Sequence, residues 1–294
     1  MPGSTQSDLL FAIAFLSSGL GWFPAFSASG SDEFINDAGI KSSFETKLGA
    51  LFEAGGIPKA TDVLKQLREE KRSELTLPAP APTQEIHPPE VYERTRNASL
   101  VLGHLYLCGK CENYHANLAG GVILSPDGLV LTNFHVIDFK EAIVFGAMTA
   151  NGTIFGIEKV VASSKQNDLA LLKLREAKDL TYVVPQEKIE TGEEIFVISH
   201  PDGHFYTLTK GYLARKYLTP KQKTPMLQIT ADFAKGSSGA GIFNALGELA
   251  GIATSTSSIY YDGSVESPEN LQMVIKSGIP ASSLRGLFSP EKSP

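Results

Sequence analysis

From residue 91 onward, short apolar runs alternate with clusters of turn-forming residues. Gly, Pro, Asp and Asn separate the runs, as in the SPDG turn at residues 125–128. No helical pattern alternates with them, which disfavours a parallel α/β sheet. The pattern predicts an all-β fold of barrel or sandwich type, with a short helix near residues 280–288. The predicted strands span residues 99–107, 119–124, 129–132, 142–145, 153–161, 169–174, 194–199, 206–214, 226–231, 241–244 and 248–254.

Residues 31–75 follow a different pattern, in which apolar positions recur at spacings of three and four. Such spacing predicts a helix with one apolar face. Gly55 and Gly56 interrupt it, and a second helix is predicted over residues 59–74. We therefore expect a helical segment at residues 29–76. Its inward positions are Ile40, Phe44, Leu48, Leu51 and Phe52 in the first helix and Val63, Leu64 and Leu67 in the second.

The stretch LPAPAPTQEIHPPE at residues 77–90 is rich in proline. Proline lacks the backbone N–H that helix interiors and central strands require. The stretch therefore predicts a linker between the helical segment and the β-rich part of the chain.

The N-terminal stretch LLFAIAFL at residues 9–16 has the length of the apolar core of a signal peptide, and small residues follow at 25–30. The region before it contains Asp8 and no Lys or Arg, which a signal peptide usually has. We expect a signal peptide at residues 1–28 and an exported protein, either periplasmic or secreted. An uncleaved membrane anchor and an ordinary buried segment remain the alternatives, although Gly19, Gly21 and Pro24 weaken the anchor.

Composition and charge narrow the function classes. The chain has 294 residues, of which 42% are hydrophobic and 20% charged, as in soluble globular proteins. Its formal net charge is −6 and no basic run stands out, so we expect no nucleic-acid partner. Two cysteines are too few for a disulfide-stapled scaffold.

Three polar groups stand beside predicted strands in the order His, Asp, Ser. His135 directly follows a strand, Asp168 directly precedes one, and the segment AKGSSGAGIF leads into another. Acyl transfer by serine needs a hydroxyl, an imidazole that takes its proton and a carboxylate that orients the imidazole. Each group alone is typical of a turn or a structural role, but together they indicate this chemistry.

The motifs TNFHV, NDLALLKL and GSSGAGIF resemble the three conserved blocks of chymotrypsin-fold serine proteases, and most closely those of the bacterial HtrA/Deg peptidases. VYERTRNASLVLG is similar to the first strand of that family and IKSGIPASSLRGL to its closing segment. The resemblance implies a protease domain at residues 91–288, built from two six-stranded antiparallel β-barrels.

The resemblance also implies the roles of the residues. Ser238 would be the nucleophile, His135 the general base and Asp168 the residue that orients it. The backbone N–H groups of Gly236 and Ser238 would form the oxyanion hole. It further implies hydrolysis of peptide bonds through an acyl-enzyme, protein or peptide substrates that include misfolded chains, and no cofactor for catalysis.

The chain departs from the family pattern at several positions. Digestive relatives have an Asp where Ser237 stands, so their zymogen switch is not expected here. HtrA proteins usually carry PDZ domains after the protease, and we expect none in this chain. Ala240 replaces a glycine, a small change that should be tolerated.

Substrate selection is predicted at two places. Asp232 occupies the position at the base of the primary pocket in trypsin-like enzymes, where a carboxylate favours Lys or Arg, although HtrA pockets usually accept small aliphatic residues. The alternative for Asp232 is a local backbone hydrogen bond. Thr254, Ser255 and Thr256 match the strand edge that pairs with substrate backbone, a form of β-augmentation.

The segment GHLYLCGKCENYH contains His104, Cys108, Cys111 and His115. Cys-x-x-Cys is a common half of a tetrahedral zinc site, with His115 as a third ligand and His104, or the distant His200 or His204, as the fourth. A disulfide between Cys108 and Cys111 and free or redox-active thiols are equally open interpretations. In each case, the cluster lies outside the catalytic residues.

Two alternatives to an active protease are a catalytically silent module of the same fold that holds extended or unfolded peptides, and a metal-dependent regulatory protein centred on the Cys/His cluster. The intact set of His135, Asp168 and Ser238 argues against the silent module. Assembly into a homo-oligomer is left open by the sequence.

Overall fold

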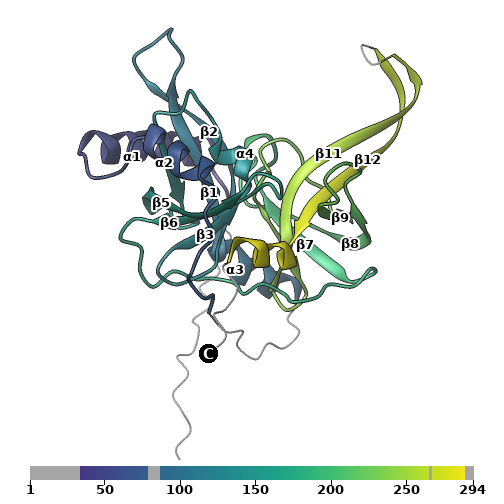
Figure 1. The fold of residues 1–294 in the computed structure, drawn as a ribbon. Helices are drawn as coiled ribbons and strands as arrows, with labels where there is room; N and C mark the ends of the chain where they lie inside the picture. The colour runs from purple at the N-terminus through teal and green to yellow at the C-terminus, as the bar shows by residue number, and fades with distance from the viewer. Residues whose placement is uncertain (1–33, 79–86, 265–266, 289–294) are drawn as a thin grey trace, which may run out of the picture. The chain divides into compact units, whose positions relative to one another are not determined.

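The structure, a computed structural model, describes residues 34–78, 87–264 and 267–288. From Asn36 onward, the described residues include two closed barrels, each of six antiparallel strands (Figure 1). The two-barrel fold implied by the resemblance is therefore confirmed. The predicted signal peptide at residues 1–28 lies outside the described residues. Within the described part of the chain, no helix combines the length and the apolar character needed to cross a membrane.

Each barrel is built from consecutive strands in a closed order. In barrel 1 the order is β1 (Ser99–Leu107), β2 (Tyr114–Ile123), β3 (Leu129–Thr132), β6 (Leu169–Leu174), β5 (Ile154–Ser164) and β4 (Val144–Met148). In barrel 2 it is β10 (Gly241–Asn244), β11 (Leu249–Gly263), β12 (Pro268–Pro280), β9 (Pro225–Ile229), β8 (Thr207–Leu218) and β7 (Glu194–Ser199). A 3₁₀-helix, η1 (Pro201–Gly203), follows β7, and a second, η2 (Ala281–Leu287), forms at the predicted closing helix.

Strands β11 and β12 differ most from the sequence prediction, which ended one at residue 254 and missed the other. Their outer halves pair with each other from Thr256–Lys276 to Gly263–Pro268 and extend away from barrel 2 as a two-stranded arm (Figure 1). Residues 255–263 and 268–273 are exposed throughout. Because neither face of the arm is buried, its sequence has no alternation of apolar and polar residues to indicate a strand.

Helices α1 (Asp37–Glu53) and α2 (Ala60–Arg68) pack on barrel 1. Leu48 of α1 is fully buried against Gly146 of β4. Val63 and Leu67 form the buried face of α2. Helix α2 is shorter than predicted because the chain turns at Glu70, which has a left-handed φ of 48°.

A third helix, α3 (Pro88–Ala98), corrects two predictions. It occupies the end of the expected linker and residues 91–98 of the segment that resembles the family's first strand, whereas the strand predicted at 99–107 is confirmed as β1. Proline is compatible with a first helical turn, because the N–H groups there have no partner within the helix. Val91, Thr95 and Ala98 form the buried face of α3. Residues 79–86 of the expected linker lie outside the described residues.

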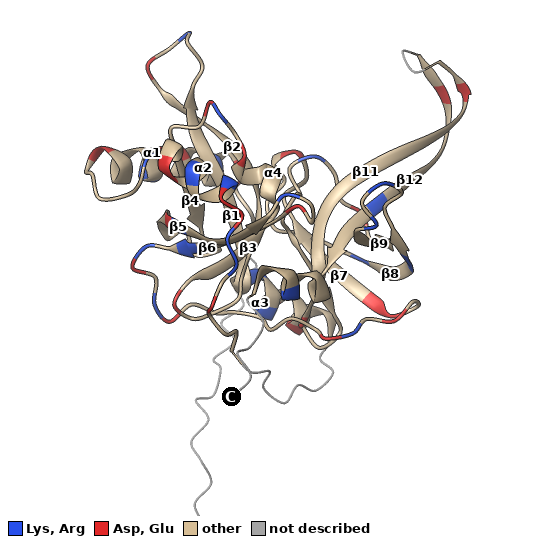
Figure 2. Ribbon diagram, in the orientation of Figure 1, with Lys and Arg blue, Asp and Glu red and all other residues tan. Residues whose placement is uncertain are grey.

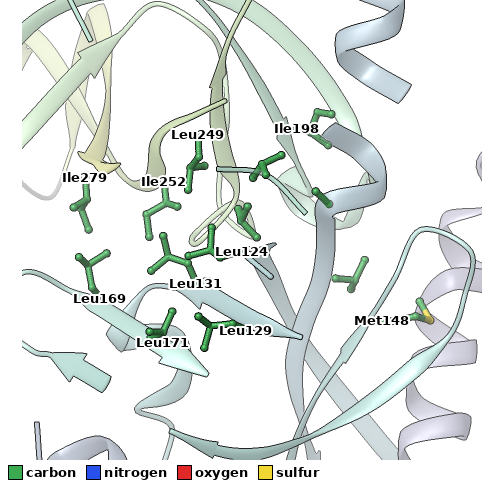
Figure 3. Close-up of a cluster of buried hydrophobic side chains, with 14 of the residues drawn as sticks. Leu124, Leu129, Leu131, Met148, Leu169, Leu171, Ile198, Leu249, Ile252 and Ile279 are labelled. Carbon is green, nitrogen blue, oxygen red and sulfur yellow. The ribbon is translucent and has the colours of Figure 1, made fainter. Parts of the chain in front are cut away.

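The two barrels share an apolar cluster (Figure 3). Burial of one such side chain contributes about 1.5–3 kcal/mol. The cluster therefore fixes the positions of the two barrels, and of the strands that carry the candidate site, relative to each other. Its members include Leu129, Leu131, Leu169 and Leu171 from barrel 1 and Ile198, Leu249, Ile252 and Ile279 from barrel 2.

Candidate active site

Strand pairing in barrel 1 brings His135 and Asp168 together. Thr132, the last residue of β3, pairs with Ala170 of β6. His135 follows β3 in a single helical turn, α4 (Phe134–Ile137), and Asp168 directly precedes β6. The two side chains therefore meet at one end of the β3–β6 pair, and His135 Nδ1 lies 2.9 Å from Asp168 Oδ2.

Asp168 is fixed by several further hydrogen bonds. Its Oδ1 accepts from the backbone N–H of His135 at 3.0 Å, and its Oδ2 accepts from Thr254 Oγ1 at 2.9 Å. Asn133 Nδ2 donates to its backbone carbonyl at 3.0 Å. The backbone of Asp168 has a φ of 52°, in the left-handed region. The contacts of Thr254 and Asn133 with Asp168 were not predicted, because no local sequence signal reports contacts between strands.

The hydroxyl of Ser238 lies on the other side of the imidazole. Its Oγ is 2.9 Å from His135 Nε2. Its backbone carbonyl accepts from the N–H of Gly120 at 2.8 Å, which ties this loop of barrel 2 to β2 of barrel 1. The neighbouring Ser237 is fully buried. Of the two serines, only Ser238 therefore presents its hydroxyl to the imidazole.

The turn before Ser238 requires glycine at residue 236. Gly236 has a φ of 93°, and a Cβ there would lie 2.6 Å from the carbonyl oxygen of His200. Within the turn, the N–H of Ser237 donates to Ala234 and the N–H of Ala240 to Ser237. Among the described residues, the N–H groups of Gly236 and Ser238 have no hydrogen-bond acceptor.

Asp232 has an ionic partner that the sequence did not indicate. Its exposed carboxylate lies 3.4 Å from Nζ of Lys276, whose side chain is only 13% exposed. The same ammonium donates to the carbonyl of Phe233 at 2.6 Å. Lys276 is on β12 and pairs with Thr256 of β11, in the predicted substrate strand. The carboxylate of Asp232 therefore has a cationic partner in this structure.

The segment from Thr254 to Thr256 has one unpaired edge. β11 pairs with β10 only as far as Ile252, whereas its pairing with β12 continues through Ser255 and Thr256. Ser255 and Thr256 are exposed. Within the described strands, the edge of β11 next to Ser238 is thus free to accept another extended chain.

The Cys/His segment forms a cluster of three at the tip of the β1–β2 hairpin. Cys108 Sγ and Cys111 Sγ are 3.5 Å apart as free thiols, and Cys111 Sγ lies 3.2 Å from His115 Nε2. Hydrogen bonds from the backbone N–H of Lys110 and from Cys111 lower the pKa of Cys108 to about 7.

His104, the first choice for a fourth ligand, lies outside this cluster, and that prediction is wrong for this structure. Its buried ring stacks on Phe139 at 4.3 Å and contacts Asn117, and burial lowers its pKa to about 4. The two distant alternatives are engaged elsewhere: His200 contacts the carbonyl of Leu100, and His204 lies 3.7 Å from Asp37.

Residues 119–252 match the model of the trypsin-like peptidase domain, a range that contains His135, Asp168 and Ser238. The chain is 35% identical over 145 residues to a "probable periplasmic serine endoprotease DegP-like" of Marinomonas sp. strain MWYL1, covering 48% of this chain and 30% of that protein. It is 30% identical over 190 residues to the serine endoprotease DegS of Escherichia coli K12, covering 61% of this chain and 52% of the relative. The chain thus spans between about a third and about half of these relatives.

A solved structure described as the HtrA-type protease AlgWS227A with tripeptide has the same fold. It superimposes with a TM-score of 0.54 at 24% identity and covers 66% of this chain and 60% of its own.

Proposed function

We propose that this chain, which carries a trypsin-like peptidase domain of the HtrA type, is a serine endopeptidase that works through an acyl-enzyme. The observation that carries the proposal is the continuous hydrogen-bonded line from Asp168 through His135 to Ser238, with both contacts at 2.9 Å. This is the geometry that transfers a proton from a serine hydroxyl to an imidazole.

In the proposed reaction, Ser238 Oγ attacks the scissile carbonyl while His135 Nε2 takes its proton. His135 then returns that proton to the leaving amine, and a water molecule repeats the sequence to release the acyl group. Asp168 accepts from Nδ1–H, which keeps the proton off Nε2 and stabilises the imidazolium. The side chain of His135 is 50% exposed, so the site is open to a substrate.

The N–H groups of Gly236 and Ser238 would bind the oxyanion. Neither donor has an acceptor in the described part of the chain. The left-handed φ of Gly236 supports this role, because it turns the peptide units that carry these donors. Loss of one such donor typically costs about 3 kcal/mol of transition-state stabilisation.

The substrates we propose are extended segments of proteins or peptides, including misfolded chains. The free edge of β11 at residues 254–256 supports this class, since it offers backbone hydrogen bonds with little demand on side chains. Lys and Arg are dispersed over many elements rather than gathered on one (Figure 2), which does not favour a nucleic-acid partner. The periplasmic relatives support an exported location. Assembly into a homo-oligomer stays a prediction.

Covalent labelling with a fluorophosphonate probe tests the proposed activity. We expect labelling of the wild type, none of Ser238→Ala or His135→Ala, and full labelling of the control Ser258→Ala, an exposed serine on β11. If the folded wild type is not labelled, the chain is a catalytically silent module that only binds peptides.

A further inference from the structure

Three soft ligand atoms meet at the tip of the β1–β2 hairpin, away from the catalytic residues. They are Sγ of Cys108, Sγ of Cys111 and Nε2 of His115, all within 4.8 Å of one another. The thiols are exposed, so a metal ion can reach them from solvent.

The spacing of these atoms agrees with a tetrahedral metal site. With Zn–S and Zn–N bonds of about 2.3 Å and 2.1 Å, a tetrahedron places two sulfurs about 3.8 Å apart and a sulfur and a nitrogen about 3.6 Å apart. The corresponding separations here are 3.5 Å and 3.2 Å. These two separations therefore lie within a few tenths of an ångström of the tetrahedral values. A disulfide needs its sulfurs about 2.05 Å apart, a much larger movement.

The hairpin already holds the ligands in place. The backbone N–H of Lys110 donates to Cys108 Sγ at 3.4 Å, a contact that stabilises a thiolate. His115 lies on β2 opposite Tyr106 of β1, and the two rings are 5.8 Å apart. Beside it, the N–H of Ala116 donates to Glu45 of α1 at 3.0 Å, which anchors this part of β2 to the helix.

We propose that Cys108, Cys111 and His115 bind one Zn²⁺ ion, with water in the fourth position. No other His, Cys, Asp or Glu of the described residues joins the group, and in the proposed site water completes the tetrahedron. Both cysteines bind as thiolates, and binding releases their thiol protons to solvent. The ion joins the two ends of the hairpin loop and stabilises its tip beside α1.

This zinc is structural and takes no part in peptide hydrolysis. His115 and Gly120 lie on the same strand, and Gly120 is the residue that contacts the carbonyl of Ser238. At about 3.4 Å per residue, this stretch of strand separates the metal from the serine loop by about 17 Å. Metal binding and probe labelling of Ser238 are therefore separate measurements, and failure of one leaves the other intact.

Zinc titration of the full chain, reduced and then freed of reductant and metal, tests the proposal. We expect one equivalent of Zn²⁺ per chain, measured by competition with a chromogenic chelator, and a higher Tm with zinc. Substitution of cobalt should give thiolate-to-metal charge-transfer bands. Cys111→Ser and His115→Ala should each weaken zinc affinity by at least about 10- to 100-fold. In other metal sites, removal of a contact that only supports a ligand already has an effect of this size.

Lys110→Ala is the matched control, since it keeps all three ligands and the backbone donor, and it should bind zinc as the wild type does. The proposal is overturned if the reduced wild type takes up no more zinc than Cys111→Ser. It is equally overturned if protein prepared without reductant contains a disulfide between Cys108 and Cys111 and no zinc.

Discussion

Acid should destabilise the fold through buried neutral histidines, and His200 shows why. Its Nε2 lies 3.0 Å from the carbonyl oxygen of Leu100 and must donate, whereas its Nδ1 accepts from the N–H of Tyr206 at 3.1 Å. A proton on Nδ1 would face another donor, so the folded protein requires the neutral ring. Burial accordingly lowers the pKa of His200 to about 4, and burial lowers the pKa of His104 to the same value.

The sign and the size of the effect follow from these pKa values. In the unfolded chain each imidazole has a pKa of about 6.5, so below this pH the unfolded state binds protons that the folded state does not. Stability is therefore complete above about pH 6.5 and falls as the pH decreases toward 4. Between pH 7.5 and pH 5.0, one such histidine reduces the free energy of unfolding by about 2 kcal/mol and the two together by about 4 kcal/mol.

Urea unfolding at pH 7.5 and pH 5.0 measures this loss, with Ser238→Ala as the background to prevent self-digestion. His200→Gln removes one titrating group and should have about half of the pH-dependent loss of the parent. His87→Asn, a change at an exposed histidine, should leave the loss unchanged. If the unfolding free energy of the parent protein differs by less than about 1 kcal/mol between the two pH values, His104 and His200 are not both neutral in the folded protein.

Three further predictions follow from single contacts. Thr254→Val removes a hydrogen bond to the carboxylate of Asp168, a contact to a charged group worth about 1.5–3 kcal/mol, so kcat/KM on a peptide substrate should fall about 10- to 150-fold with little change in Tm. Lys276→Ala frees Asp232, and in a peptide library cleavage after Lys or Arg should rise about fivefold, whereas an unchanged profile would exclude Asp232 from selection. Leu48→Ala leaves a cavity between α1 and barrel 1 and should cost about 2–5 kcal/mol in urea unfolding, with Ser238 still labelled at low temperature.

The residues of the candidate site were predictable because each is marked by its own local sequence. His135 and Asp168 stand next to strands whose apolar runs are unmistakable, and the pairing of β3 with β6 then brings them together. Both strands were predicted with the bounds that the structure has, at 129–132 and 169–174. The turn before Ser238 was also predictable from the sequence, since its glycines permit the left-handed backbone that Gly236 adopts.

The contacts that the sequence did not predict depend on the register between strands and on strands that are exposed on both faces. The ion pair between Asp232 and Lys276 joins residues on two segments whose relative position is set by the pairing of β9 with β12, and β12 has no apolar alternation in its outer half. His104 was grouped with the cysteines by spacing along the chain, yet it lies on β1 with its ring buried between Phe139 and Phe145. Spacing along the sequence therefore does not predict which side chains lie close together in this hairpin, because its strands are buried and its tip is exposed.

The candidate site depends on both barrels, which explains why its geometry is held by contacts far from the chemistry. Ser238 belongs to barrel 2, but its carbonyl is bound by Gly120 of barrel 1, and Thr254 of barrel 2 orients Asp168 of barrel 1. An apolar cluster with members from both barrels joins them as well (Figure 3). Because each contact requires the same relative placement of the barrels, packing in that cluster sets the distance between the hydroxyl and the imidazole. Alignment of the three side chains is in this sense a property of the interface between the barrels rather than of any one loop.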